Sequence, residues 1–261
     1  MGDTVSILST TLAATAGLMV AVWLLSLLKK DASIVDIFWG LGFVLIAEVC
    51  YATTSGYHPR KVLITSLVAV WGIRLASHIF LRNKSKSEDF RYKAMRARFG
   101  ERFPIVSLFT VFALQGLLMW IISLPIQIAE TSREPARLRW LDWAGAAIWL
   151  IGFLFESIGD AQLALFKADR GNKGKVMDGG LWRYTRHPNY FGDALLWWGL
   201  YVIALSTPGG AWTVISPLIM TGLLMKVSGV ALLEKTLKRT KPEYLNYVRR
   251  TSAFFPWMPR G

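Results

Sequence analysis

The chain alternates long apolar runs with short polar segments. Seven runs, each of roughly twenty residues, cover 5–28, 34–54, 62–81, 105–129, 140–164, 190–206 and 211–232. Runs of this length can cross the hydrocarbon core of a bilayer as helices. The pattern predicts an all-α, polytopic membrane bundle of about seven transmembrane helices, forming one domain over residues 1–261. The basic stretch 82–104 predicts a short interfacial helix in its second half, and 233–261 forms a polar tail.

The distribution of Lys and Arg predicts the orientation of this bundle. Segments 29–33, 82–104, 165–189 and 233–261 carry 23 of the 30 basic residues, and the alternate connections carry 5. Positive charge collects on the cytosolic side of membrane proteins. We therefore expect the N-terminus outside and the C-terminus in the cytosol. The first run has no preceding Lys or Arg, unlike a signal peptide, so we expect it to be a retained helix.

Composition narrows the classes of ligand. Hydrophobic residues make up 53% of the chain, and the formal net charge is +13. In a membrane protein this excess fits basic cytosolic loops and phosphate-bearing ligands or lipids, so we expect membrane lipids as partners and no nucleic acid. Cys50 is the single cysteine, which excludes an intramolecular disulfide. The three histidines have no ligand-type spacing, so no metal site is predicted.

Ionisable residues lie within or at the ends of the predicted spans. Such groups are costly in lipid and usually face a partner or a cavity. Eight of the nine fall in the cytosolic half, and Glu48 lies toward the other side. The eight are Asp36, Arg74, His78, Glu156, Asp160, Asp193, Lys226 and Glu234. A salt-bridge network with Arg74 and Lys226 as counter-charges is one interpretation, and a polar ligand pocket open to the cytosol is the other.

The segment 179–193, GGLWRYTRHPNYFGD, carries the densest polar chemistry. Pro188 suits the first position of a helix, and the free N–H groups at a helix start attract anions. Arg183, Arg186 and His187 add positive charge there. A solvated basic loop would explain these charges equally well. It would not explain Asn189 and Asp193, which enter the span one turn apart on one face.

These residues resemble a known family. The run GLWRYTRHPNYFGDALLWWG, preceded by ESIGDAQ at 156–162 and followed by Glu234 and the tail segment YLNY at 244–247, is similar to the steroid 5-alpha-reductase-like membrane proteins. It looks closest to their bacterial branch of unknown function. The segments SIVDIFWG at 33–40 and EDFRY at 88–92 also resemble that branch. The resemblance covers residue 33 to the end.

The resemblance implies a seven-helix protein, expected in a bacterial inner membrane, that binds NADPH from the cytosol. It would reduce a carbon–carbon double bond conjugated to a carbonyl in a lipophilic substrate. By position, the resemblance places the cofactor contacts at Glu156, Asp160, Lys167, Lys175, Asn189, Asp193, Lys226 and Glu234, with Arg186, His187 and Tyr247 as additions.

The resemblance also places Asp36 where the steroid reductases use a glutamate to hold the substrate carbonyl. Their catalytic tyrosine falls near Trp71 or Arg74, where this chain has no tyrosine. Hydride addition builds charge on the carbonyl oxygen, and a protonated carboxyl or a cation stabilises it. Asp36, kept neutral by burial, or Arg74, as a fixed cation, are therefore the candidate catalytic residues.

Two other functions remain open. The last two helices are similar to those of isoprenylcysteine carboxyl methyltransferases, whose cofactor, S-adenosylmethionine, carries no phosphate. The basic residues Lys167, Arg170, Lys173 and Lys175 favour a phosphate-rich cofactor. A non-enzymatic lipid-binding or transport protein is the third possibility, and the absence of paired broken spans disfavours transport.

Overall fold

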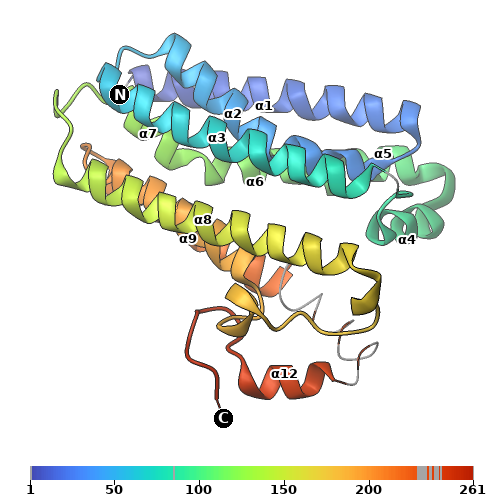
Figure 1. Ribbon diagram of the computed structural model, residues 1–261. Coiled ribbons are helices and arrows are strands. Elements are labelled where there is room, and N and C mark those ends of the chain that lie inside the picture. The colour runs from blue at the N-terminus through green and yellow to red at the C-terminus, as the bar shows by residue number, and fades with distance from the viewer. Residues whose placement is uncertain are drawn as a thin grey trace. The chain divides into compact units, whose positions relative to one another are not determined.

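The computed structural model describes residues 2–84, 86–227, 234, 237, 241 and 243–260. Within these residues every regular element is a helix, and one isolated bridge joins Thr185 to Ser252 (Figure 1). The all-α prediction is confirmed. Five helical stretches are long and apolar enough to span a membrane, namely Thr4–Lys29, Ala32–Thr53, His58–Asn83, Phe90–Ile122 and Trp140–Ala168. The count of seven and the orientation stay predictions.

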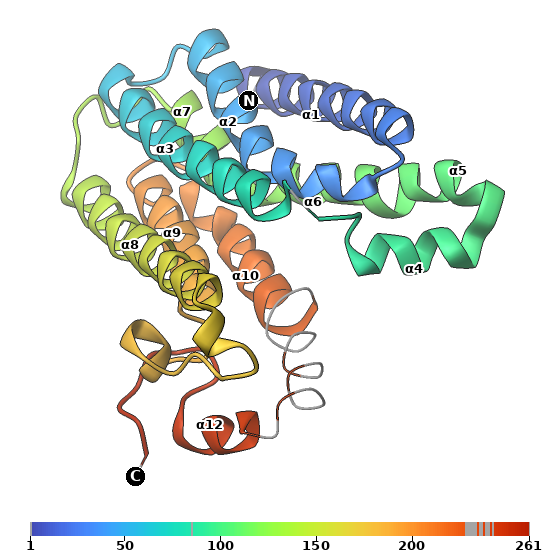
Figure 2. The same ribbon diagram turned by 45° about the vertical axis from the view of Figure 1, so that its right-hand side comes forward.

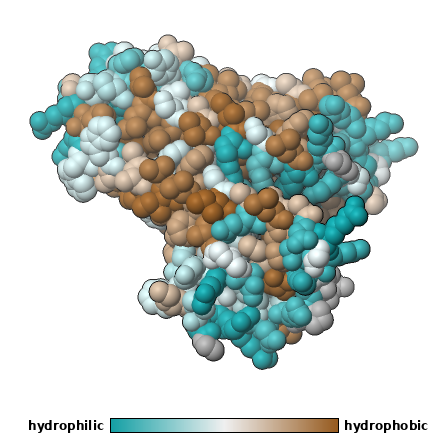
Figure 3. All heavy atoms as spheres, in the orientation of Figure 1, coloured by the Kyte–Doolittle hydropathy of each residue, from teal (hydrophilic) through white to brown (hydrophobic). Residues whose placement is uncertain are grey.

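The outer surfaces of these helices are apolar. Leu28, Leu81 and Leu165 are among the most exposed large side chains, and Figure 3 shows apolar residues gathered over one face of the helices. Burying apolar surface is favourable in water, so helices that keep such side chains outside fit a lipid surrounding. The chain is therefore a multi-pass integral membrane protein, as its pattern predicts.

The helices group into two compact units. The first contains Met1–Arg139 and Ala204–Thr213, and the second contains Trp140–Ile203 and Val214–Gly261. The organisation as one domain stays a prediction. The first unit holds α1 (Gly2–Lys29), α2 (Val35–Thr53), α3 (His58–Asn83), α4 (Phe90–Phe99), α5 (Phe103–Ser107), α6 (Leu114–Ile122) and α7 (Leu124–Thr131). Helix α4 confirms the short helix expected in the basic stretch.

Helices α2 and α3 pack closely at one glycine pair. A Cβ atom added to Gly40 would lie 2.5 Å from the Gly72 carbonyl oxygen, and one added to Gly72 would lie 2.6 Å from that of Gly40. Real side chains do not tolerate such distances, so both positions require glycine. This contact fixes α2, and with it Asp36, against α3.

The apolar stretch expected as one span over 105–129 is not one regular helix. It runs through α5, a π-helical segment Leu108–Ala113 and α6, and it turns at Ser123 before α7. Pro125 lies in the first turn of α7, and proline cannot continue a helix from the preceding turn. The Gln127 amide donates hydrogen bonds to Ser123 Oγ and the Trp120 carbonyl, which stabilise the turn.

The second unit holds α8 (Trp140–Ala168), α9 (Pro188–Ala204), α10 (Ile215–Gly222), a π-helical continuation Leu223–Val227 and α12 (Tyr244–Arg250). Figure 2 shows α8, α9 and α10 side by side. A short 3-10 turn, Gly210–Val214, precedes α10. The predicted span 211–232 therefore begins as expected, and its last residues, 228–232, lie outside the described part.

Candidate functional site

Closely packed glycines bring α9 against α8. Cβ atoms added to Gly152 or Gly192 would lie 2.4–2.6 Å from backbone atoms of the facing helix, and those added to Gly145 or Gly199 would lie 2.6–2.8 Å from atoms there. Gly159 follows at the same spacing and faces Pro188 at 3.1 Å. The chain shows this signal as glycines seven residues apart on both helices, but the sequence analysis did not use it. The backbones of α8 and α9 therefore lie in contact along the stretch that carries the predicted polar residues of the site.

This packing brings predicted site residues together in the second unit. Asn189, in the first turn of α9, donates a hydrogen bond of 3.0 Å from Nδ2 to Oδ1 of Asp160 on α8. Glu156 lies one turn earlier on α8 and is 3% exposed. The buried Oδ1 atom of Asn189 has no hydrogen-bond partner among the described residues. Because buried polar atoms normally have partners, this oxygen can accept a hydrogen bond from a ligand.

Asp193 lies one turn after Asn189 and is half-buried. Its Oδ1 atom is buried, so this side chain is not fully exposed to lipid. Carboxylates and an amide oxygen on adjacent faces form a set of hydrogen-bond acceptors. The arrangement is suited to a ligand rich in hydroxyl or N–H groups.

Arg186 and Glu234 form a buried ion pair near the start of α9. Arg186 Nε lies 2.7 Å from Glu234 Oε1, and His187 Nε2 lies 3.4 Å from the same oxygen. Arg186 Nη1 also donates to the carbonyl oxygens of Val248 and Thr251. Through these bonds Arg186 holds the C-terminal end of α12, and Thr251 directly after it, next to the start of α9. Arg186 therefore has a positioning role.

Tyr247 has a comparable structural contact. Its hydroxyl donates to the Trp182 carbonyl, and the side chain is buried. Burial, together with the nearby Glu234 carboxylate, raises the pKa of Tyr244 to about 12, and burial also raises the pKa of Tyr247 above its usual value. Both phenols therefore stay protonated at neutral pH. Tyr247 acts as a hydrogen-bond donor in this part of the fold, whereas the buried Tyr244 hydroxyl has no hydrogen-bond partner among the described residues.

A basic cavity of about 230 Å³ lies between α12 and the C-terminal segment. Four arginines contribute to its lining, together with Trp257: Arg186, Arg249, Arg250 and Arg260. No Asp or Glu is among its described lining residues, although Asp178 approaches Arg250 at 3.5 Å. The Arg260 N–H donates to the Arg250 carbonyl. Guanidinium groups bind phosphate oxygens well, so the cavity is suited to a phosphate-bearing ligand. Arg249, Arg250 and Arg260 were not predicted as site residues from the sequence.

The predicted lysines lie apart from this cavity lining. Lys167, Lys175 and Lys226 are exposed. The Lys175 carbonyl oxygen accepts a hydrogen bond from the Lys241 ammonium group. Exposed lysines can attract an anion at long range, but their charge is screened by salt.

Asp36 belongs to the first unit, where it has partners from α4. Tyr92 donates from its hydroxyl to Asp36 Oδ1 at 2.9 Å, and Arg91 Nη2 donates to Oδ2 at 2.9 Å. Gln115 Nε2 lies 3.3 Å from the Tyr92 hydroxyl and donates to it. Both carboxylate oxygens thus accept hydrogen bonds, so Asp36 is arranged as an acceptor and Tyr92 carries the proton. The expected role of Asp36 as a neutral catalytic donor stays a prediction.

The turn before α4 fixes this arrangement. Asp89 caps α4 by accepting from the Arg91 N–H. Glu88 accepts from the Ala32 N–H and from two nitrogens of Arg96. Partial burial disfavours the charged form of Glu88, but the hydrogen bonds from Arg96 and Ala32 outweigh it, so the pKa of Glu88 lies below its ordinary value. Arg74, the other catalytic candidate, is half-buried on α3.

Arg60 and Lys61 fall in the connection 55–61, which the predicted orientation puts outside, and the structure buries both. Arg60 is 0% exposed and donates to the carbonyl oxygens of Pro135 and Arg137. Lys61 Nζ donates to the Thr54 carbonyl. Glu130, also 0% exposed, accepts from Thr65. His58-Pro59 starts α3 earlier than expected, and that earlier start is the signal that would have put these cations on a packed helix.

These predicted site residues therefore fall into three groups, two in the second unit and one in the first. Glu156, Asp160, Asn189 and Asp193 gather on α8 and α9, and Arg186, His187 and Glu234 form a second cluster in the same unit. Asp36 lies in the first unit with Arg91 and Tyr92. The convergence of Asp36 with Glu156, Asp160, Asp193 and Lys226 in one pocket stays a prediction.

Comparison with known proteins places the chain in a family. Residues 22–251 match the family described as "Protein of unknown function (DUF1295)", and the chain belongs to this family, which is associated with steroid 5-alpha-reductase-like proteins. The chain is 22% identical over 260 residues to "Uncharacterized protein C594.04c" of Schizosaccharomyces pombe, a match covering 90% of this chain and 75% of that protein. No solved structure matches.

Proposed function

We propose that the protein is a membrane-embedded, NADPH-dependent reductase of carbon–carbon double bonds conjugated to a carbonyl group. Its substrate would be lipophilic, of steroid or isoprenoid character. The observation that carries the proposal is the arginine-lined cavity of the second unit, in the same unit as the acceptor set of α8 and α9. NADPH carries phosphates and ribose hydroxyls. Its phosphates would bind to the arginines of the cavity, and its ribose hydroxyls would donate to the acceptors of α8 and α9.

The residues of the second unit would share the binding of this cofactor. Arg249, Arg250 and Arg260 would bind phosphate oxygens, because guanidinium groups pair with them in charge-assisted hydrogen bonds. Asp160, Glu156 and Asn189 would accept hydrogen bonds from ribose hydroxyls or the carboxamide. Arg186 and Glu234 would position the C-terminal segment, and Lys167, Lys175 and Lys226 would attract the anionic cofactor from solution.

Tyr92 would act as the proton donor in the first unit. When bound, NADPH supplies a hydride to the β-carbon of the substrate. The Tyr92 hydroxyl, held by Gln115, would turn its single proton from Asp36 to the enolate oxygen and donate a hydrogen bond to it. It would then transfer that proton to the enolate oxygen, which gives the enol that tautomerises to the saturated carbonyl product. Arg91 would keep the Asp36 carboxylate in place.

A methyltransferase that uses S-adenosylmethionine is the rival function. The hydroxyl-binding acceptors of α8 and α9 would suit that cofactor as well, but its lack of phosphate leaves the arginine-lined cavity without a role. A non-enzymatic lipid-binding protein could use the arginine-lined cavity for a headgroup phosphate, but it would need no acceptors for ribose hydroxyls.

The activity itself is tested by following NADPH oxidation at 340 nm with the purified full chain and a panel of lipophilic enones and enoyl thioesters. We expect one class to support turnover that forms the saturated carbonyl product. Methyl transfer from S-adenosylmethionine to any lipid acceptor, without NADPH oxidation, would refute the proposal.

The proposed orientation, with the C-terminus cytosolic, has a separate test. Cys50 is the only cysteine, so a Cys50→Ala background allows single reporter cysteines. Ser55→Cys should react with an impermeant maleimide from outside intact cells, and Ser252→Cys should react only after lysis. The opposite result would reverse the orientation.

A further inference from the structure

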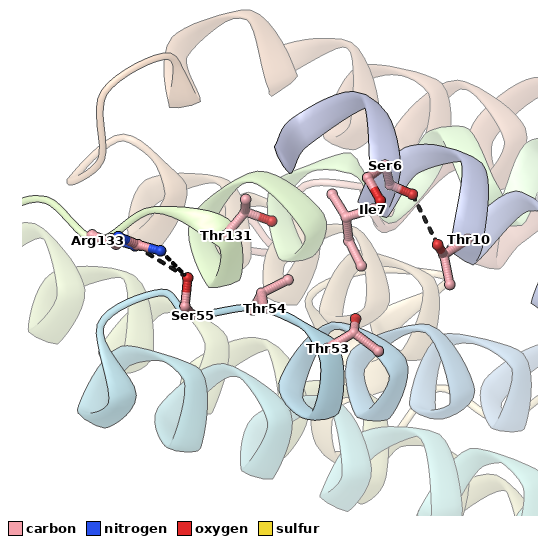
Figure 4. A pocket seen from close by; sticks show the side chains of 8 residues that line it. All are labelled: Ser6, Ile7, Thr10, Thr53, Thr54, Ser55, Thr131 and Arg133. Atoms are coloured by element: carbon pink, nitrogen blue, oxygen red, sulfur yellow. Dashed lines mark hydrogen bonds between the residues drawn. The ribbon is translucent and has the colours of Figure 1, made fainter. Parts of the chain in front are cut away.

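The first unit has a cavity of about 200 Å³ that none of the proposed chemistry uses (Figure 4). Its polar lining comes from Ser6 and Thr10 of α1, residues 53–55 at the end of α2, and Thr131 and Arg133 at the end of α7. Since each water takes up about 30 Å³, the cavity is large enough for a small polar group. Six hydroxyl groups and one guanidinium surround it.

The hydroxyl groups are arranged as acceptors. Thr10 donates its proton to the Ser6 carbonyl, Thr53 to that of Val49, and Thr131 to that of Gln127, at 2.6–2.9 Å. A hydroxyl has one proton and two lone pairs, so these oxygens turn lone pairs toward a ligand. Such a lining favours a ligand group that donates N–H or O–H bonds, and an ammonium group is the strongest donor of this kind.

Arg133 supplies a positive charge at the same cavity, which can pair with an anionic group of the ligand. Its Nε and Nη2 atoms both donate to Ser55 Oγ, at 3.1 and 2.5 Å, which directs the guanidinium toward the hydroxyl-lined side (Figure 4). A guanidinium pairs well with phosphate. The cavity therefore offers acceptors for a cation and a donor for an anion. This combination matches a zwitterion that carries an ammonium and a phosphate close together.

The position of the cavity identifies the source of such a zwitterion. It lies at the beginning of the candidate span Thr4–Lys29 and at the end of the candidate span Ala32–Thr53. The ends of a spanning helix meet the headgroup layer of a bilayer. Val5, beside Ser6, is 63% exposed, as suits contact with acyl chains. A lipid headgroup is therefore the ligand that we expect at this depth.

We propose that this cavity binds the headgroup of an aminophospholipid, with its primary ammonium on the threonine hydroxyls and its phosphate on Arg133. The site is independent of the reductase chemistry. Its function would be to hold one lipid against α1, α2 and α7 at the membrane boundary.

The test is native mass spectrometry of the full chain in detergent with equal amounts of phosphatidylethanolamine and phosphatidylcholine of the same acyl chains. The two headgroups share charge and phosphate, but only ethanolamine donates N–H bonds. We expect ethanolamine lipid to be retained about 3- to 10-fold over choline lipid, with N-methyl and N,N-dimethyl lipids intermediate. If the wild-type protein retains the ethanolamine and the choline lipid equally, the proposal is overturned, and no variant is needed for that conclusion.

Matched variants assign the contacts. Thr10→Val with Thr53→Val should reduce the ethanolamine preference toward one, and Arg133→Gln should reduce retention of both lipids about 10-fold. Thr110→Val is the control for the first change, because Thr110 makes the same hydroxyl bond to the Val106 carbonyl on an exposed surface. Arg137→Gln is the control for the second. Equal losses in the control variants, or displacement of the lipid by soluble phosphoethanolamine at matched concentration, would contradict the lipid site.

Discussion

Asn189 donates a hydrogen bond of 3.0 Å to Asp160, and this bond joins the first turn of α9 to the buried face of α8. It orients the Asn189 amide so that Oδ1 is buried without a partner among the described residues. A ligand that donates to this oxygen would complete the hydrogen bonds of the Asn189 amide. The Asn189–Asp160 bond therefore marks where we propose that the cofactor is held.

Replacing Asn189 by alanine should weaken NADPH binding about tenfold, because the ligand loses one acceptor and Asp160 loses the hydrogen bond from Asn189. Fluorescence titration of the purified protein with NADPH measures this. Asn246→Ala is the matched control, since Asn246 is exposed on α12. An affinity that stays unchanged in Asn189→Ala would remove this residue from the site.

The glycine contact of α8 and α9 should be sensitive to a single methyl group. A Cβ atom at Gly192 would lie 2.4 Å from both the Glu156 nitrogen and the Gly152 oxygen, whereas one at Gly222 meets nothing within 4 Å. Gly192→Ala should therefore lower the free energy of unfolding by about 1–3 kcal/mol, seen as a lower apparent Tm in a thermal melt. Gly222→Ala should not. Equal melting of the two variants would contradict the close approach.

Tyr92→Phe should lower kcat about 100-fold or more and leave NADPH affinity unchanged, because the phenol contributes only to proton transfer. Asp36→Asn should have a smaller effect, since it misaligns Tyr92 without removing the proton. Steady-state assays with the active enone, combined with NADPH titration, separate the two. A Tyr92→Phe enzyme with wild-type kcat would leave the proton donor to another residue, with Arg74 the next candidate.

Glu88 should stabilise the first unit only at pH values where it is ionised. Its pKa is lower in the folded protein than the ordinary value of 4.5. The contribution is therefore fully present above the unfolded value and lost as the pH falls through the folded value. Thermal melts should show that Glu88→Gln lowers the apparent Tm at pH 7, and that the difference from wild type shrinks below pH 4.5. The exposed Glu101→Gln variant should show no such pH dependence.

Much of the fold follows from the sequence for a physical reason. Apolar length and charge asymmetry act along the chain, so runs such as 5–28 and 140–164 identify α1 and α8 directly. The polar faces of α8 and α9 follow as well, because Glu156 and Asp160, like Asn189 and Asp193, are spaced by one helical turn.

Contacts between distant segments could not be predicted in the same way. Tyr92 is 56 residues from Asp36, and no periodicity links them. The arginine-lined cavity depends on how the chain folds back after α12, and the burial of Arg60 depends on the carbonyl oxygens of 135 and 137. The glycine spacing of α8 and α9 was visible, but its meaning depends on the two helices being neighbours.

The most direct test of the account is calorimetric titration of the purified full chain with NADPH, NADH and S-adenosylmethionine. We expect NADPH to bind with a Kd on the order of micromolar and S-adenosylmethionine not to bind. NADH should bind with a Kd at least about tenfold higher than that of NADPH, because NADH lacks the additional phosphate. Arg249→Gln with Arg260→Gln should weaken NADPH binding, and the exposed Arg98→Gln should not. Heat from S-adenosylmethionine with none from NADPH would contradict the central claim.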